Sequence, residues 1–189
     1  MMKSILQYSH HLLAKTLDSG DTAIDATCGN GHDTVFLCQA VGEKGHVYGF
    51  DIQDAAIANT KKRLRNKKLT NATIIKDSHS NFQHHVPVDR LTRLGGAIFN
   101  LGWLPGSDKS IITKADSTIL ALEGLLEHIK TGGMVVLVVY HGHPGGEEEK
   151  YHLMQYTRQL NQKHFNVLYY GFINQKNKPP FILAIQKKS

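Results

Sequence analysis

The sequence predicts an α/β fold with a doubly wound, seven-stranded sheet that is mostly parallel and has an antiparallel last strand. From residue 22 onward, short runs rich in apolar and β-branched residues alternate with segments of helical period, as in a repeated βα unit. The run MVVLVVY at 134–140 is apolar throughout, which is typical of a parallel strand covered by helices on both faces. A length of 189 residues fits a single domain, 1–189, with a sizeable core.

The expected elements follow in order along the chain. An amphipathic helix is expected within the first 17 residues, and two long irregular loops are expected at 78–93 and 100–115. The predicted parallel strands are 22–27, 46–51, 72–76, 96–100 and 134–140. The predicted helices are Asp33–Val41, Asp54–Lys67, Asp116–Lys130 and about Glu147–Asn161, and acidic residues at their starts suit the helix dipole.

The C-terminal tail has a different pattern. FNVLYYGFI and PFILAIQKK read as two strands, and only the short polar stretch NQKNKP separates them. Such a short polar connection indicates a hairpin rather than a crossover helix, so the last strand should run antiparallel.

Composition and charge narrow the class of protein. The formal net charge is +6, from 22 Lys and Arg against 16 Asp and Glu, which favours an anionic partner. Cys28 and Cys38 fall in a loop and in the helix after it, where a disulfide would distort the helix, so a reducing, cytoplasmic location is expected. No apolar run reaches the ~20 residues of a membrane span, and we expect no membrane partner.

A glycine-rich loop follows the first predicted strand. In DATCGNGHDT, Gly29 and Gly31 allow a sharp turn and close approach of a ligand before the helix begins, although an ordinary tight turn would also explain them. Asp51 stands twenty residues beyond Gly31, at the end of the second strand, where a carboxylate can accept hydrogen bonds from ribose hydroxyls.

Two cofactor classes share that geometry, a dinucleotide and S-adenosylmethionine. The third glycine of a dinucleotide loop is replaced by Thr34, and Asp25 would repel a pyrophosphate but suits the cationic amino-acid end of S-adenosylmethionine. Asp77, after the third strand, either holds the adenine edge or caps a helix. Cys28 is expected to fill space rather than act as a nucleophile. The predicted cofactor-binding set is completed by neighbouring residues: Thr27, Asn30, Gln53, Ser78 and Asn100.

The end of the fourth strand carries the predicted acceptor side of the site. The amide oxygen of Asn100 can accept a hydrogen bond from an amine and turn its lone pair toward a methyl donor, while Trp103 can stack on a base. A capped turn with a packed tryptophan is the alternative. The predicted substrate-binding residues are Trp103, Pro105, Gly106, Lys109 and His143.

Three motifs together, DATCGNGHDT, NLGWLPGSDK and VVYHGHPGG, resemble the small bacterial "putative rRNA methylase" family of class I methyltransferases. Members of that family are understood to methylate the 5-aminomethyl group of the tRNA wobble uridine. The resemblance implies a Rossmann-like class I methyltransferase fold and a tRNA anticodon stem-loop as partner, and it leaves a homodimer open. It also implies S-adenosylmethionine on Asp25, Gly29, Gly31 and Asp51, with substrate groups on Asn100, Trp103, Lys109, His141 and His143. Family members often carry Tyr at the position of Trp103, and either ring can stack.

The histidines allow several interpretations. No recognised zinc spacing accompanies them, so we expect no metal. His141 and His143, after the fifth strand, are predicted as catalytic residues together with Asn100. The predicted role of the two histidines is to bind a nucleotide phosphate or to accept a proton, and loop capping is the alternative. The cations between Lys61 and Lys68 are interpreted as a solvated helix face.

The leading hypothesis is therefore an S-adenosylmethionine-dependent N-methyltransferase of the tRNA wobble uridine amine. A methyltransferase acting on ribosomal RNA or on a small amine is the first alternative. A nucleotide- or RNA-binding module without catalysis is the second, and a nicotinamide-dependent reductase is the weakest because the third glycine is missing.

Overall fold

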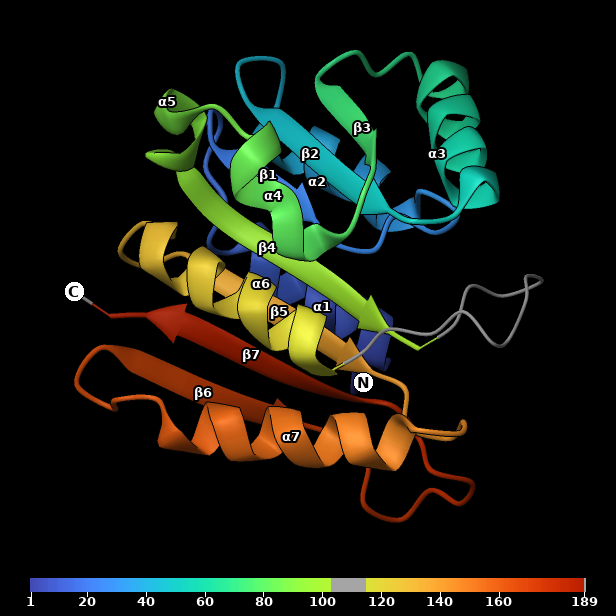
Figure 1. Cartoon of the computed structure of the whole chain (residues 1–189), viewed down its shortest axis with the longest axis vertical. Coiled ribbons are helices and arrows are strands. Elements are labelled where there is room, and N and C mark those ends of the chain that lie inside the picture. The colour runs from blue at the N-terminus through green and yellow to red at the C-terminus, as the bar shows by residue number, and fades with distance from the viewer. Residues whose placement is uncertain (103–114, 189) are drawn as a thin grey trace.

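The computed structural model describes residues 1–102 and 115–188, which form a seven-stranded sheet of order β3-β2-β1-β4-β5-β7-β6 (Figure 1). Strands β1 to β5 pair in parallel, and β7 pairs antiparallel with both β5 and β6. The predicted fold class is confirmed. The strands are β1 Thr22–Asp25, β2 His46–Asp51, β3 Ala72–Lys76, β4 Leu94–Leu101, β5 Met134–Val139, β6 Phe165–Tyr170 and β7 Phe181–Lys187.

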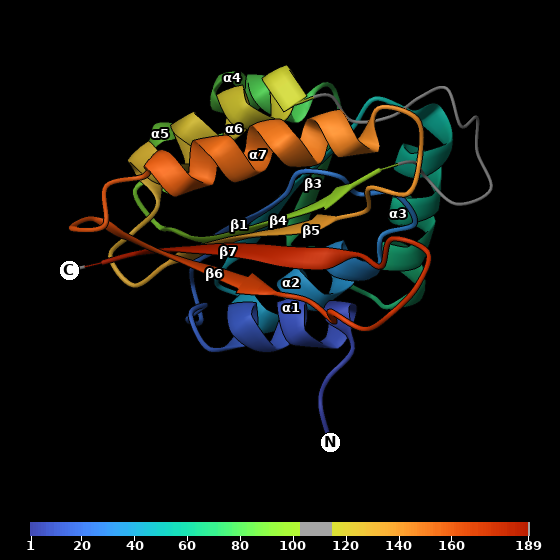
Figure 2. The same cartoon turned by 90° about the horizontal axis from the view of Figure 1, so that it is seen from below.

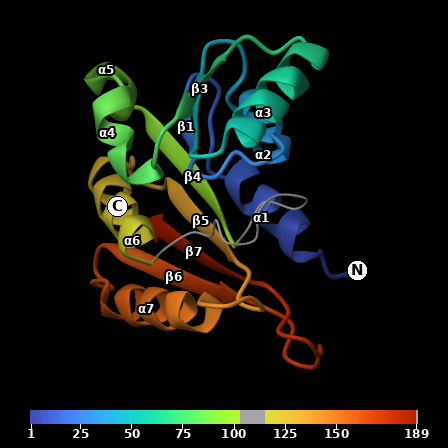
Figure 3. The same cartoon turned by 45° about the vertical axis from the view of Figure 1, so that its right-hand side comes forward.

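Helices cover both faces of the sheet, as Figures 2 and 3 show. One face carries α1 Ile5–Ala14, α2 His32–Val41 and α3 Asp54–Asn66, and the other carries α4 Phe82–His85, α5 Val88–Leu91, α6 Ala115–His128 and α7 Gly146–Gln159. Each face therefore has its own apolar core. The β5 side chains are buried along the whole strand, as the uniform apolar run predicts.

The long predicted helices form close to their expected positions. The N-terminal helix α1 begins after a capping box, in which the Ser4 side chain accepts from the backbone N–H of Gln7 and the Gln7 side chain accepts from the N–H of Ser4. The acidic first turns of α3, α6 and α7 are also present. These local signals agree with the global packing, which explains why these elements were predictable.

The expectation of an irregular loop over 78–93 was wrong. This stretch contains a 3₁₀ turn, η1 His79–Asn81, followed directly by α4 and then α5, with Pro87 between the two helices. Each piece has only three or four residues, too few for a helical period to show in the sequence. Phe82, Val86 and Leu91 are buried, and this burial holds the short pieces on the sheet.

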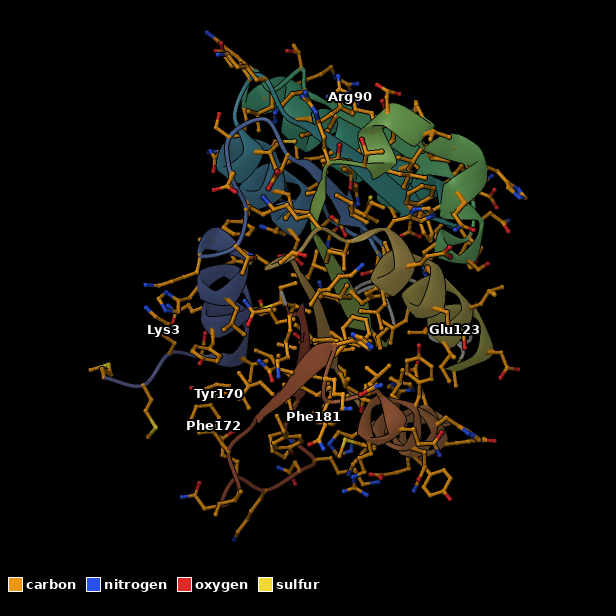
Figure 4. All side chains as sticks on the ribbon, turned by 90° about the vertical axis from the view of Figure 1, so that its left-hand side faces the viewer. Lys3, Arg90, Glu123, Tyr170, Phe172 and Phe181 are labelled. Carbon is orange, nitrogen blue, oxygen red and sulfur yellow. The ribbon has the colours of Figure 1, made fainter. Side chains whose placement is uncertain are left out.

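The C-terminal hairpin is confirmed, with β7 inside the sheet and β6 at its edge. Because β6 runs in the same direction as β5, the C-terminal ends of β1, β4, β5 and β6 all lie on the same side of the sheet. Figure 4 shows Tyr170, at this end of β6, near Lys3, and the Tyr170 hydroxyl donates to the Lys3 carbonyl oxygen over 2.7 Å. No described helix is long and apolar enough to cross a membrane.

Candidate active site

The glycine-rich loop connects β1 to α2, and the side chain of Asp25, the last residue of β1, supports it. This carboxylate is fully buried, and it accepts hydrogen bonds from the backbone N–H of Thr27 over 3.2 Å and from the Thr34 hydroxyl over 2.5 Å. Gly31 precedes α2 with a φ of +76°, and a Cβ there would lie 2.9 Å from the Cα of Thr60. Only glycine allows both this backbone conformation and the close approach of the loop to α3.

Asp51, at the end of β2, lies directly against the loop. Its Oδ2 accepts from the backbone N–H of Gly29 over 3.0 Å, and its Oδ1 accepts from the N–H of Gln53 over 3.0 Å. On the side of α3, the backbone carbonyl of Asn30 accepts from Arg63 Nε over 2.6 Å. The structure therefore brings together the loop and the carboxylate that the sequence spacing pairs, and it fixes the loop by hydrogen bonds from both sides.

The electrostatics of this end of the sheet favour a cation. The pKa of Asp25 is raised to about 7, first by burial and then by the nearby Asp33 carboxylate, with a smaller contribution from Asp51. The hydrogen bonds from Thr34 and Thr27 oppose this rise. A positive charge placed nearby would stabilise the ionised form of Asp25. This fits the cationic amino-acid end and the sulfonium of S-adenosylmethionine. Because Asp25 is buried, it acts through its charge and by supporting the loop.

Asp77, after β3, is held by protein groups. Its Oδ1 accepts from the N–H of Ser78 over 2.7 Å and from Asn81 Nδ2 over 3.0 Å, and its Oδ2 lies 2.7 Å from His85 Nε2. The hydrogen bonds from His85 and Asn81 lower the pKa of this carboxyl group. Of the two roles open from the sequence, this geometry favours the structural one, while Ser78 caps η1.

Asn100 lies near the end of β4, beside the loop. Its backbone N–H donates to the Thr27 hydroxyl over 2.7 Å, and its side-chain Nδ2 donates to Asp33 Oδ2, in the first turn of α2. The predicted cofactor loop and the predicted acceptor residue are thus joined by hydrogen bonds. The predicted substrate-binding residues Trp103, Pro105, Gly106 and Lys109 lie outside the described residues.

The two histidines after β5 are buried and have protein partners. His141 Nδ1 lies 2.9 Å from Glu147 Oε1, and His141 Nε2 lies 3.1 Å from the Pro179 carbonyl oxygen. The pKa of Glu147 is lowered to about 2 by His141 first and by Lys178 next. His143 Nδ1 lies 2.9 Å from the Pro144 carbonyl oxygen. Because both ring nitrogens of His141 face acceptors, this geometry favours anchoring of the loop before α7 over proton transfer.

Four residues to which sequence reasoning assigned no role in the site also belong to this region. Asp33 and Thr34 stand within the loop motif, and their side chains contact Asn100 and Asp25. His79 donates from Nδ1 to the Ala26 carbonyl oxygen over 3.0 Å, and burial lowers its pKa. His10 comes from α1, 23 positions before its partner Asp33. The motif could have drawn attention to Asp33, but no sequence signal joins α1 to it.

Neither a metal nor a reactive thiol is supported by the described part of the chain. Residues 1–102 and 115–188 contain no group of three or more His, Cys, Asp or Glu side chains that could hold a metal ion. Cys28 and Cys38 are free and buried, and burial raises the pKa of both thiols, which keeps them protonated.

Comparisons with known proteins identify related methyltransferases. The family model described as "Putative rRNA methylase" matches residues 47–186, and that of the ubiE/COQ5 methyltransferase family matches residues 2–89. A crystal structure of a "putative rRNA-methylase" from Clostridium thermocellum has a TM-score of 0.94 and 43% identity, covering 99% of both chains. A "putative methyltransferase" from Streptococcus mutans, solved in complex with SAH, has a TM-score of 0.90 and 37% identity, covering 99% of both chains.

A curated relative is the Arabidopsis thaliana "tRNA (mnm(5)s(2)U34)-methyltransferase, chloroplastic", which is 40% identical over 156 residues. The match covers 78% of this chain and 56% of that relative, so the chain spans little more than half of its length.

The fold and these comparisons together define a class I methyltransferase that uses S-adenosylmethionine. Within that class, the chain belongs to the family described as "Putative rRNA methylase".

Proposed function

We propose that this protein transfers a methyl group from S-adenosylmethionine to the 5-aminomethyl nitrogen of the wobble uridine in tRNA. The observation that carries the proposal is the orientation of Asn100. Its NH₂ group is bound by Asp33, so its carbonyl oxygen is the atom left to accept from a substrate. An amide oxygen beside a methyl donor suits an amine, which has N–H groups to donate. The name of the Arabidopsis relative supports tRNA and the wobble position as the target.

S-adenosylmethionine would be held by the loop and by the ends of β2 and β3. Asp51 keeps acceptor capacity for ribose hydroxyls beyond its bonds to Gly29 and Gln53, because a carboxylate accepts about four hydrogen bonds. Gly29 and Gly31 shape the loop, and Asp25 supplies negative charge beneath it. The remaining proposed cofactor-binding residues are Thr27, Asn30, Gln53 and Ser78. Asp77 is proposed to position Ser78, from whose backbone N–H it accepts, and Asn100 is proposed to lie beside the methyl group without adding to cofactor affinity.

The cofactor supplies an electrophilic methyl group on a sulfonium. The neutral amine attacks that carbon in line, so the N–C bond forms as the C–S bond breaks and the electron pair of that bond goes to sulfur. The product amine leaves as a cation and loses its proton to water. Alignment is the main contribution of such a site, and Asn100 is the residue placed to give it.

The acceptor side of the site extends beyond the described residues. Trp103, Pro105, Gly106 and Lys109 are proposed to contact the nucleotide, together with His143 beside Gly102. A Cβ placed on Gly102 would lie 3.8 Å from His143 Nε2, so this histidine stands next to the end of β4. His141 and His143 stay candidates for catalysis. A cytoplasmic location, in keeping with the free thiols of the two cysteines, is part of the proposal.

Ribosomal RNA is the second candidate substrate, because the description of the matched family names it. Deletion of the gene, followed by mass spectrometry of nucleosides from tRNA and from rRNA, separates the two. The proposal expects the methylaminomethyl nucleoside to disappear from tRNA and the aminomethyl precursor to accumulate. Loss of a methylated nucleoside from rRNA, with the tRNA profile unchanged, would refute the proposal and favour the second candidate.

A further inference from the structure

A chain of hydrogen bonds runs from helix α1 to the acceptor side of the site. His10 Nε2 lies 2.5 Å from Asp33 Oδ1, and Asp33 Oδ2 accepts from Asn100 Nδ2. The two oxygens of one carboxylate thus join a histidine of α1 to the asparagine of β4. The pair is sheltered, since the side chains of His10 and Asp33 are 31% and 12% exposed.

We propose that His10 and Asp33 are positioning residues, which hold the Asn100 amide with its carbonyl oxygen toward the acceptor amine. This inference rests on the role proposed for Asn100 above. Neither residue needs to touch the substrate. Their effect on the reaction passes through the orientation of one amide.

The chemistry of the partners fixes the direction of that amide. An ionised carboxylate only accepts hydrogen bonds, so the Asn100 group that faces Asp33 has to be the NH₂ group. A flipped amide would place its oxygen against the Asp33 carboxylate and turn its NH₂ group toward the substrate amine. The N–H groups of that amine would then have no acceptor. Within residues 1–102 and 115–188, no hydrogen-bond donor is found for the side-chain carbonyl oxygen of Asn100. It stays available to the substrate.

His10 has the role of holding Asp33 in this orientation. A sheltered carboxylate with a single donor could rotate toward water or toward the loop, whereas two donors on opposite oxygens fix its plane. His10 is itself held by Phe36 of α2, because the two rings stack with centroids 4.0 Å apart and planes 2° from parallel. The backbone N–H of Asn100 is fixed separately by Thr27, so only the side-chain orientation depends on Asp33.

A purely structural role for His10 makes a different prediction. In that case, the ring stacking on Phe36 would matter, and the hydrogen bond to Asp33 would not. His10→Phe keeps a stacking ring and removes the donor. His10→Gln removes the ring but keeps an N–H that can reach Asp33. His11→Phe is the matched control on the same helix, since the described contact of His11 is a ring contact with Tyr8 at 6.0 Å.

The test measures single-turnover methylation of tRNA that carries the 5-aminomethyl group, together with S-adenosylmethionine affinity, for each variant. If His10 is a positioning residue, His10→Phe should slow methyl transfer roughly 5- to 20-fold, and the affinity for cofactor and tRNA should stay within about twofold of wild type. His10→Gln should recover most of the rate, and His11→Phe should leave it unchanged. In an Asn100→Ala background, His10→Phe should cause no further loss, because the residue through which it acts is gone.

A second readout does not depend on the substrate. The side-chain NH₂ resonances of Asn100, assigned by their loss in Asn100→Ala, should shift and exchange faster with water in His10→Phe but not in His11→Phe. If wild type fails to methylate this tRNA, the proposed function is wrong, and the NMR spectra alone decide whether His10 positions the amide. Unchanged Asn100 resonances, or equal rate losses in both Asn100 backgrounds, would overturn the positioning role.

Discussion

Replacement of Asp25 by Asn should stabilise the protein, and the gain should grow with pH. Asp25 is fully buried, with a pKa raised from 3.8 to about 7 by burial and by Asp33. Between these two values the folded state keeps a proton that the unfolded chain has lost, so the free energy of unfolding of wild type falls as pH rises. Asn has no such proton, and it can still accept from Thr27 and donate to the Thr34 hydroxyl.

The size of the effect follows from the linkage relation. Well inside this window each pH unit changes the free energy of unfolding by about 1.4 kcal/mol, and the slope falls to half of that at the folded-state pKa. The advantage of Asp25→Asn should therefore grow by about 2 kcal/mol from pH 5 to pH 7 and level off near pH 8. Urea unfolding at four pH values from 5 to 8 measures it. Comparing variant with wild type cancels the other titrating groups to first order.

Asp18→Asn is the control for this experiment. The pKa of Asp18 is lowered by the hydrogen bond from Lys130, so Asp18 is ionised throughout this pH range in both folded and unfolded states. Its difference from wild type should therefore stay constant from pH 5 to pH 8. A constant difference for Asp25→Asn as well would show that Asp25 titrates normally, and the electrostatic account of the loop would be wrong.

Four further predictions concern ligands and the loop. Asp51→Ala should weaken S-adenosylmethionine binding by about 10- to 100-fold in calorimetry, from the loss of charge-assisted hydrogen bonds worth about 1.5 to 3 kcal/mol, and an unchanged Kd would remove Asp51 from the cofactor site. Asn100→Ala should slow single-turnover methylation by about tenfold or more with cofactor affinity retained, whereas loss of affinity alone would assign it to cofactor binding. Gly31→Ala should lower the melting temperature, because its φ of +76° and the contact with Thr60 both oppose a Cβ. Affinity for tRNA should fall steeply between 50 and 200 mM salt in a filter-binding assay, as expected when a protein of net charge +6 releases counterions, and a flat response would favour a small-molecule acceptor.

The fold was predictable from the sequence because its local signals agree. The apolar run of β5, the helix-capping residues and the short polar turn of the C-terminal hairpin each agree with the packing in the structure. The place where prediction failed is 79–91, since single-turn helices have no period to detect and are held by long-range burial of residues such as Phe82. Secondary-structure pattern therefore identifies the sheet and its long helices but not the short pieces packed against it.

The candidate site was predictable only in part. The spacing from Gly31 to Asp51 led to the correct pair of segments, because strands β1 and β2 are neighbours and end at the same edge. The link from His10 to Asp33 depends on where α1 packs, and no motif encodes that. The contact of His141 Nε2 with the Pro179 carbonyl oxygen likewise depends on a segment 38 positions further along the chain. Roles assigned to Trp103 and Lys109 stay predictions.

The most direct test of the central claim is the transfer of an isotopically labelled methyl group. Purified protein would be incubated with S-adenosylmethionine carrying a trideuterated methyl group and with total RNA from a strain that lacks the gene. Tandem mass spectrometry of the nucleosides and of RNase fragments then locates the label. The account predicts the label on the aminomethyl nitrogen of the tRNA wobble uridine, and label found only in ribosomal RNA, or on a ring carbon or ribose oxygen, would contradict it.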